Sequence, residues 1–248
     1  MRKLLQILLC CVVLASCDKP GDCVKSTGKM ASKTYDGLVF TKIIVRKGIG
    51  LVIAQGDEYK VEVRSGENLI GDIEVKLIGD MLSLEDNTTC NWVRDYGQTV
   101  VYITAPNLTD VYSKTEQPII SAGTLSYPDL HLYAMDSNDS YSGTGTSDFY
   151  LNIGGGNVSV GCNSVSRFYL SGQAQNLDVS FYASGGILYA QQLETENIHL
   201  YHRGSNEMYV YPQQSLTGDI YSLGNVYSVT HPPSVNVVEH YRGRLIFL

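Results

Sequence analysis

Charged side chains are scarce in this 248-residue sequence, in which Asp, Glu, Lys and Arg together make up only 17% of the residues. The formal net charge at pH 7 is −7, and the sequence contains no run of basic residues. An acidic protein without a basic patch is poorly suited to bind nucleic acid or anionic lipid headgroups. The composition therefore argues against nucleic acid as a partner.

Long apolar runs are missing after residue 14, so no later segment predicts a membrane-spanning helix. The apolar stretch at residues 4–14 follows Arg2 and Lys3 and is interrupted only by Gln6. A short positive region, a short apolar region and then small residues are typical of a secretory signal peptide. We expect residues 1–16 to be that signal.

The residues that end this signal, Leu14, Ala15, Ser16 and Cys17, resemble the lipobox of bacterial lipoproteins. The resemblance implies that the chain is cut before Cys17, that Cys17 carries lipid, and that the outer membrane holds the protein through it. Residues 17–37 would form a tether. The sequence fits both a periplasmic and a surface-exposed orientation of the anchored protein. An ordinary signal peptide followed by a chance cysteine is the alternative.

Recognisable catalytic motifs are also lacking: there is no nucleophile elbow, phosphate loop or zinc signature. His199 and His202 are three residues apart, which on a strand places them on opposite faces and predicts two solvated histidines rather than a metal pair. Residues 136–139 (DSND) resemble a calcium loop in composition alone, because the required Gly and distal Glu are missing. We expect no catalytic residue, metal or cofactor.

Three cysteines remain after the signal and Cys17. Cys23 and Cys90 lie in polar, turn-like contexts, and an exported protein sits in a compartment that permits disulfides, so we expect these two to be bonded. Cys162 lies within a strand pattern and is expected to be a buried free thiol. Trp92, the single tryptophan, is expected to pack over the disulfide.

Helical periodicity is nearly absent, and from residue 38 onward short runs alternate between apolar and polar residues, as strands do. After residue 106 a longer period of about 20 residues appears, which is typical of a solenoid. Two series of apolar residues mark it. The first is Leu108, Leu130, Phe149, Phe168, Ile187 and Met208, and the second is Val158, Leu177, Ile198 and Ile220.

This period predicts an all-β fold in which residues 38–248 form a parallel β-helix. Residues 38–105 would be an N-terminal β portion packed in line with a repeat portion at residues 106–248. A β-sandwich is the competing fold, because short strands at regular spacing also suit it. The in-phase repeats and the near absence of hairpin turns favour the β-helix.

Aromatic residues recur at the outward positions of these repeats. Stacked in register, they would form an aromatic strip that suits binding of sugars or a protein partner. The alternative is that they only stabilise neighbouring strands. The candidate ligand-binding residues are His131, Tyr133, Tyr150, Tyr169, Tyr209 and Tyr211.

Several short motifs, taken in order, resemble the head-GIN-domain putative auto-transporter adhesins, lipoproteins of Bacteroides-type bacteria. The motifs are residues 22–28 (DCVKSTG), 40–43 (FTKI), 48–50 (GIG), 67–70 (ENLI), 90–94 (CNWVR) and 103–106 (ITAP). The resemblance implies a right-handed parallel β-helix without established catalytic residues. The sequence departs from the family where residue 50 is Gly rather than Asn.

The sequence thus predicts a non-enzymatic, lipid-anchored adhesin of the cell envelope that binds glycan or a surface protein through one face. One alternative is a carbohydrate-active β-helix enzyme similar to polysaccharide lyases. Another is a structural envelope protein that self-associates into a homo-oligomer through exposed strand edges.

Overall fold

The computed structural model describes residues 23–88, 90–95, 97–136, 145–183 and 185–248. The predicted signal peptide, the predicted lipid attachment at Cys17 and residues 137–139 of the acidic segment lie outside these ranges. The described residues form an all-β protein without an α-helix, as the sequence predicts. None of their helical turns is long and apolar enough to cross a bilayer.

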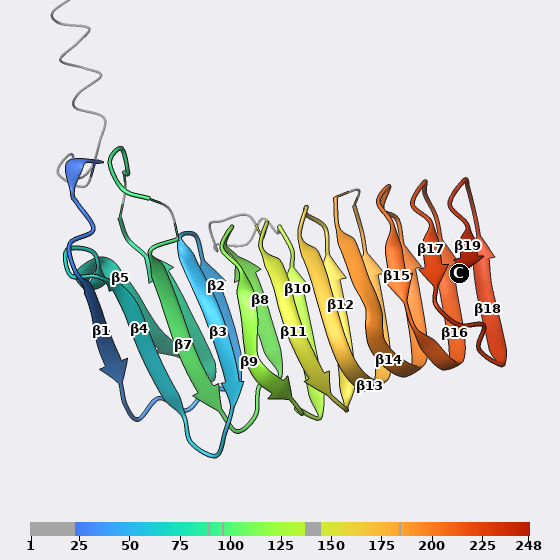
Figure 1. The fold of residues 1–248 in the computed structure, drawn as a ribbon, viewed down its shortest axis with the longest axis horizontal. Coiled ribbons are helices and arrows are strands. Elements are labelled where there is room, and N and C mark those ends of the chain that lie inside the picture. The colour runs from blue at the N-terminus through green and yellow to red at the C-terminus, as the bar shows by residue number, and fades with distance from the viewer. Residues whose placement is uncertain (1–22, 89, 96, 137–144, 184) are drawn as a thin grey trace, which may run out of the picture.

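Short strands succeed one another along the whole described chain (Figure 1). Those of the N-terminal portion are β1 (Met30–Tyr35), β2 (Lys42–Arg46), β3 (Ile49–Gln55), β4 (Lys60–Gly66), β5 (Ile73–Ile78), β6 (Met81–Asp86) and β7 (Thr99–Ala105), with the 3-10 helix η2 (Ile70–Asp72) before β5. Those that follow are β8 (Asp110–Lys114), β9 (Ile119–Leu125), β10 (Asp129–Ala134), β11 (Asp148–Gly154), β12 (Asn157–Cys162), β13 (Arg167–Phe181), β14 (Ile187–His202), β15 (Met208–Val210), β16 (Pro212–Ile220), β17 (Val226–Ser228), β18 (Ser234–Glu239) and β19 (Leu245–Phe247).

The described strands make one large mixed sheet of 19 strands. Antiparallel pairs occur among them only near the N-terminus, where β4 lies between β1 and β7, and β5 pairs with β6. From β8 onward every described pairing is parallel, and among β8 to β19 the partners lie about one repeat apart in the sequence. The strands β8 and β9 also pair with β2 and β3, which lie much farther away in the sequence. Hairpin pairing, on which the β-sandwich alternative depends, is therefore confined to the N-terminal portion.

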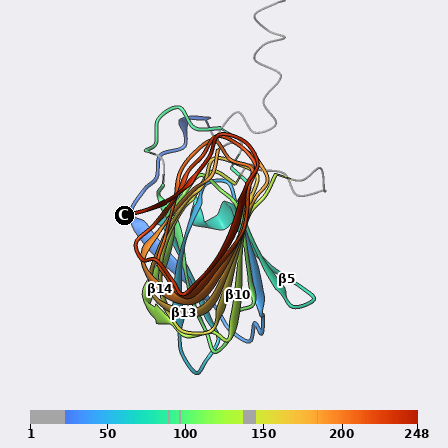
Figure 2. The ribbon, with the colours of Figure 1, turned by 90° about the vertical axis from the view of Figure 1, so that its right-hand side faces the viewer.

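The parallel pairings arrange the strands in two rows. Row A contains β7, β3, β9, β11, the first half of β13, the first half of β14, β15, β17 and β19. Row B contains β6, β2, β8, β10, β12, the second halves of β13 and β14, β16 and β18. Viewed along the long axis, successive strands overlie one another in a narrow outline (Figure 2).

The register corrects the repeat phase that the sequence suggests. Leu130 pairs with Val158 in row B, so it does not belong to the series of Phe149. Phe168 pairs with Leu188 rather than Ile187. In row B, Ile198 pairs with Leu216 rather than Ile220. The expected register was wrong because the repeats differ in length, whereas the sequence analysis aligned them by their mean period.

Alternation along the strands places one apolar set in a single buried cluster that extends from Phe40 to Val226. The strand β7 illustrates the pattern, since every second residue of it is buried. Aromatic rings also stack inside this core, where the ring centroids of Phe149 and Phe168 are 4.6 Å apart. Burial of these side chains supplies the main stabilising free energy, about 25 cal/mol per Å² of apolar surface.

A row of amide side chains runs along the outside of row B. Asn157 Nδ2 donates to Asp129 Oδ1 (2.6 Å), Asn176 Nδ2 to Asn157 Oδ1 (2.7 Å), and Asn197 Nδ2 to Asn176 Oδ1 (3.1 Å). The hydroxyl of Ser215 continues the row by donating to Asn197 Oδ1 (2.7 Å). These bonds cross from strand to strand and therefore hold the register of the stack.

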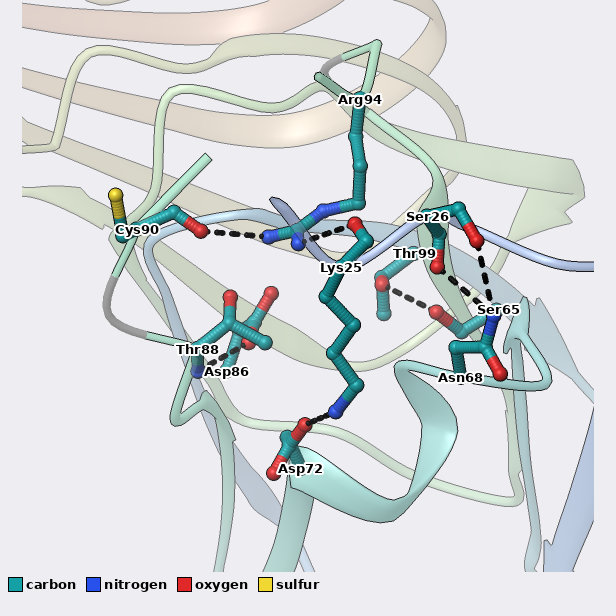
Figure 3. A network of polar contacts seen from close by, with 10 residues as sticks. All are labelled: Lys25, Ser26, Ser65, Asn68, Asp72, Asp86, Thr88, Cys90, Arg94 and Thr99. Carbon is teal, nitrogen blue, oxygen red and sulfur yellow. Dashed lines mark hydrogen bonds and ion pairs between the residues drawn. The ribbon is translucent and has the colours of Figure 1, made fainter. Parts of the chain in front are cut away.

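A disulfide between Cys23 and Cys90 closes the N-terminal end of the stack, as the sequence predicts. Arg94 lies beside it and donates to the carbonyl oxygens of Lys25 and Cys90, at 2.9 Å each (Figure 3). Lys25 Nζ also lies 2.6 Å from Asp72 Oδ2. We call residues 23–29, 66–72, 86–88 and 90–95 the N-terminal cap.

The N-terminal end of the described chain differs from the sequence-based expectations in two respects. The strand β1 lies within the segment predicted to be a tether, and pairs along its whole length with β4. Trp92 does not pack over the disulfide, because its side chain is 76% exposed while its backbone N–H donates to the carbonyl of Cys23. The cap therefore leaves this large apolar side chain in solvent.

Candidate functional site

Five tyrosine rings stack along the outer surface of row A. They are Tyr150 on β11, Tyr169 on β13, Tyr189 on β14, Tyr209 on β15 and Tyr227 on β17. Successive ring centroids are 4.7, 4.8, 5.6 and 5.1 Å apart, and successive ring planes differ by 3 to 15°. We call this row the tyrosine ladder.

The pleat of each strand explains why the rings lie in one row. Each ladder tyrosine directly follows a buried apolar residue of the core, such as Phe149 before Tyr150 and Phe168 before Tyr169. Because successive side chains of a strand point to opposite faces, the following tyrosine points outward. Parallel pairing then brings the tyrosines into register at the spacing of neighbouring strands.

Acidic side chains hold the hydroxyls of Tyr150 at one end of the ladder and of Tyr209 near the other end. Tyr150 Oη donates to Asp148 Oδ2 (3.3 Å), and Arg167 Nε donates to Asp148 Oδ1 (3.0 Å). Tyr209 Oη donates to Glu207 Oε2 (2.7 Å), which raises the pKa of Tyr209 to about 12. The pKa of Tyr150 is also raised, first by partial burial and then by the charge of Asp148.

Face-to-face stacking determines which part of each ring a ligand meets. Tyr169, Tyr189 and Tyr209 have a neighbouring ring on both faces, so their edges and hydroxyls point to solvent. Inside the ladder a ligand would therefore meet ring edges rather than ring faces. The two end rings differ, because the other neighbour in the register is Ile120 for Tyr150 and Ile246 for Tyr227. Tyr150 and Ile120 are 42% and 39% exposed.

A groove of about 510 Å³ lies beside the ladder on row A. It crosses four consecutive strands, β9, β11, β13 and β14, and its polar groups are hydroxyls and side-chain amides. Its lining residues are Ile120, Ser121, Tyr150, Leu151, Asn152, Tyr169, Leu170, Ser171, Tyr189, Gln191 and Gln192.

Irregularities in the strand register lie at the groove. The pairing of β11 with β9 shifts between Tyr150 and Asn152, and the pairing of β13 with β14 shifts between Tyr169 and Ser171. Extra residues in one partner bend the sheet and redirect side chains. Gly172 lies at this bend with a φ of +100°, where a Cβ would overlap the carbonyl oxygen of Ile153. The groove therefore depends on a glycine that the sequence pattern did not single out.

The structure brings together only part of the predicted aromatic strip. Tyr150, Tyr169 and Tyr209 belong to the ladder. His131 and Tyr133 lie in row B, where Tyr133 stacks on Tyr112 at 4.8 Å. Tyr211 lies at the corner between β15 and β16, where its carbonyl accepts a hydrogen bond from the Thr195 N–H.

Two members of the ladder, Tyr189 and Tyr227, were missed from the sequence. The predicted series used Ile187 where the register uses Leu188, so the next outward residue was read as Leu188 instead of Tyr189. The series also stopped at Met208, although Val226 pairs with it and Tyr227 with Tyr209. A repeat alignment that allowed one-residue length changes would have found both.

A second aromatic row lies at the edge of row B, and we call it the second tyrosine row. It consists of Tyr182, Tyr201, Tyr221 and His240, with centroid separations of 5.6, 5.1 and 4.1 Å. Its tyrosine rings are tilted by 43 and 50° rather than parallel. His240 Nε2 also contacts Asp219 Oδ1 at 2.6 Å.

A smaller cavity of about 240 Å³ lies in the N-terminal cap beside Cys90. Charged side chains of both signs line it, and three of them hold the surrounding loops. Arg94 binds two backbone carbonyls, Asp86 Oδ1 accepts from the Thr88 N–H (2.8 Å), and Glu116 Oε2 accepts from the Gly48 N–H (3.3 Å). The charged residues of this cavity therefore have a structural role in the cap. The groove on row A is the candidate site.

The remaining residues that the sequence singled out have structural roles. Cys162 is a buried free thiol, as predicted, and burial raises its pKa. His199 is exposed and its Nδ1 lies 3.2 Å from the Thr217 hydroxyl. His202 is fully buried, so the expected solvated pair of histidines is wrong for this residue.

Solved structures from Bacteroides and Parabacteroides species share this fold. A putative adhesin from Bacteroides fragilis NCTC 9343 aligns with a TM-score of 0.75 at 15% identity, over 90% of this chain and 99% of that one. A putative adhesin from Parabacteroides merdae ATCC 43184 aligns with a TM-score of 0.61 at 16% identity, over 91% and 98%. A putative lipid binding protein from Parabacteroides distasonis ATCC 8503 aligns with a TM-score of 0.56 at 12% identity, over 89% and 98%. No curated protein matches the sequence.

The sequence itself establishes the family. Residues 39–232 match the model of the family described as putative auto-transporter adhesin, head GIN domain. The chain belongs to this family, which confirms the resemblance seen in its short motifs. Membership indicates a protein of the cell envelope or cell surface.

Proposed function

We propose that the protein is a non-enzymatic adhesin, anchored to the outer membrane by lipid at Cys17, that binds its ligand through the tyrosine ladder and the adjacent groove. In this proposal the parallel rows are successive turns of a right-handed β-helix. Such a stack is a rigid platform because each repeat is packed against its neighbours. Family membership supports the adhesin role.

The observation that carries the proposal is the ladder beside the groove. Tyrosine supplies a large amphipathic contact with few rotatable bonds, and such residues are favoured in recognition surfaces. Here five of them are already fixed by stacking before any ligand arrives. Binding therefore costs little side-chain conformational entropy.

Binding of the double variant Tyr169→Ser, Tyr189→Ser tests the proposal. The variant removes two inner rings of the ladder. We expect its affinity for immobilised glycans or surface proteins that bind the wild type to fall at least about tenfold, which corresponds to about 1.4 kcal/mol. The matched control, Tyr201→Ser with Tyr221→Ser, removes two rings of the second tyrosine row and should bind as the wild type does. Equal loss in both variants, or cleavage of a retained glycan, contradicts the proposal.

Anchoring is tested separately in cells. Replacement of Cys17 by Ser should move the protein from the membrane fraction to the soluble fraction, because a single removable acylation site is proposed to hold it. Protease treatment of intact cells then reports which side of the membrane it faces. Retention of the Cys17→Ser protein in the membrane fraction would refute the lipid anchor.

A further inference from the structure

The groove on row A contains no charge among the described residues that line it. Asp148 and Arg167, each two residues before a ladder tyrosine that lines the groove, are not among its lining residues and pair with each other at 3.0 Å. A charged ligand group entering the groove would lose hydration without gaining a counter-ion. The net charge of −7 adds repulsion against polyanions.

The polar groups of the groove combine donors and acceptors. The side-chain amides of Asn152, Gln191 and Gln192 have no hydrogen-bond partner within the part of the chain that the structure describes. Each amide offers two N–H donors and one carbonyl acceptor. Ser121 Oγ accepts from the Asn152 backbone N–H (2.9 Å), which leaves its own proton free to donate. Such a set suits ligand groups that both donate and accept, as sugar hydroxyls do.

The orientation of the tyrosines favours the same ligand atoms. An aromatic ring is electron-rich on its faces and electron-poor at its edge. Stacking covers the faces of Tyr169 and Tyr189, and both residues line the groove, so a ligand there meets their ring edges. Electron-poor edges attract oxygen atoms, whereas cations would seek the covered faces.

The backbone around the groove leaves no place for an added peptide strand. Each of β9, β11, β13 and β14 is already paired with a strand on both sides. A peptide that binds by extending a sheet needs an unpaired edge. The groove therefore recognises side groups of a ligand rather than a peptide backbone.

We infer that the groove binds an uncharged, hydroxyl-rich glycan that lies across β9, β11, β13 and β14. This inference rests on the proposed adhesin function and names the ligand class of its site. Specificity comes from the amides of Asn152, Gln191 and Gln192, and the ring edges of the ladder form the less polar wall.

The test compares retention of the full-length mature protein on immobilised neutral polysaccharides and on polyuronates of the same linkage. We expect retention on a neutral polysaccharide with less than about a twofold change in affinity between low and high salt, because no ion pair is formed. The double variant Gln191→Glu, Gln192→Glu keeps the side-chain size but replaces N–H donors by carboxylate, and should lose at least about tenfold in affinity.

Gln213→Glu with Gln214→Glu is the matched control, because this double variant adds the same two negative charges on β16 in row B and should bind as the wild type does. Binding only to polyuronates or to peptides, or strong salt dependence, overturns the ligand class. If that binding still requires Tyr169 and Tyr189, the adhesin proposal stands. If no ligand requires them, the proposed function itself fails.

Discussion

At the scale of single residues, His202 shows how the stack controls a titratable group. Its Nε2 lies 3.0 Å from the Asn206 carbonyl, and the Gly204 N–H donates to its Nδ1 at 3.3 Å. In the register it follows Phe181 and precedes Ile220, both of which point into the core. Burial lowers the pKa of His202, so the folded protein holds the ring in its neutral form.

This burial predicts a loss of stability in mild acid. The unfolded chain, where the pKa of His is about 6.5, takes up a proton that the folded chain resists. Stability is therefore complete above about pH 6.5 and falls as the pH decreases below it, by at most about 1.4 kcal/mol per pH unit for one proton. Urea midpoints of the wild type between pH 7.5 and pH 5 measure this fall.

Two variants isolate the contribution of His202. His202→Gln should have a lower midpoint at pH 7.5 but a smaller decrease between pH 7.5 and pH 5. His199→Gln, on the exposed face of the same strand, should keep the wild-type decrease. An identical decrease in the His202→Gln protein would show that other groups cause it.

Single residues also show how far the site could be predicted. Tyr150, Tyr169 and Tyr209 were found because each follows an apolar residue at a regular interval. His131, Tyr133 and Tyr211 were grouped with them because composition does not tell which row a strand joins. That assignment depends on the corner geometry between strands, which the pairings reveal. The amides of the groove had no distinguishing pattern at all.

At the scale of strands, the bend at Gly172 gives the groove its shape. The sharp change of direction requires a positive φ, which a residue with a Cβ adopts only under strain. It also requires space that the Ile153 carbonyl already fills. Position 172 therefore requires glycine.

Gly172→Ala should lower the free energy of unfolding by about 1–3 kcal/mol, through backbone strain and displacement of β11. Denaturant unfolding measures this change. Gly71→Ala is the control for the substitution itself, because a Cβ there meets nothing within 4 Å, and it should change stability by no more than about 0.5 kcal/mol.

A second comparison separates stability from groove shape. Gly218 on β16 also has a positive φ, and a Cβ there would overlap the Leu200 carbonyl in row B. Gly218→Ala should be destabilised to a similar degree yet retain ligand binding at a temperature where it is folded. A Gly172→Ala protein with unchanged stability would refute the proposed constraint.

Strand patterns allowed much of the fold to be predicted. Alternation gave the all-β class, and the period of about 20 residues anticipated the parallel pairing after β8. The antiparallel pairs of β1, β4 and β7 were not foreseen, because alternation records which side chains are buried and says nothing about strand direction. The unequal repeat lengths likewise shifted the expected register at Leu188.

At the scale of the whole molecule, the N-terminal cap covers one end of the stack. Its disulfide joins residues 67 positions apart and encloses β1 to β6. Removing it by Cys23→Ser with Cys90→Ser should lower the free energy of unfolding by about 4 kcal/mol on the chain-entropy model. Denaturation under non-reducing conditions, with Cys162→Ala as the control, measures the difference.

The loss of stability should be confined to the N-terminal strands, because distant repeats of a stack contribute almost independently to the free energy of unfolding. Hydrogen exchange should accelerate in β1 and β4 while β13 and β14 keep their protection. Equal acceleration along the whole chain would contradict this division between cap and repeats.

The position of the disulfide also decides how the molecule carries tension. A force applied through the residues before Cys23 passes across the sulfur–sulfur bond to Cys90, and from there into β7 of row A. The segment between the two cysteines is bypassed, so the pull does not peel β1 from β4. A molecule held from this end would bear shear flow on a covalent bond rather than on the hydrogen bonds of its first strand.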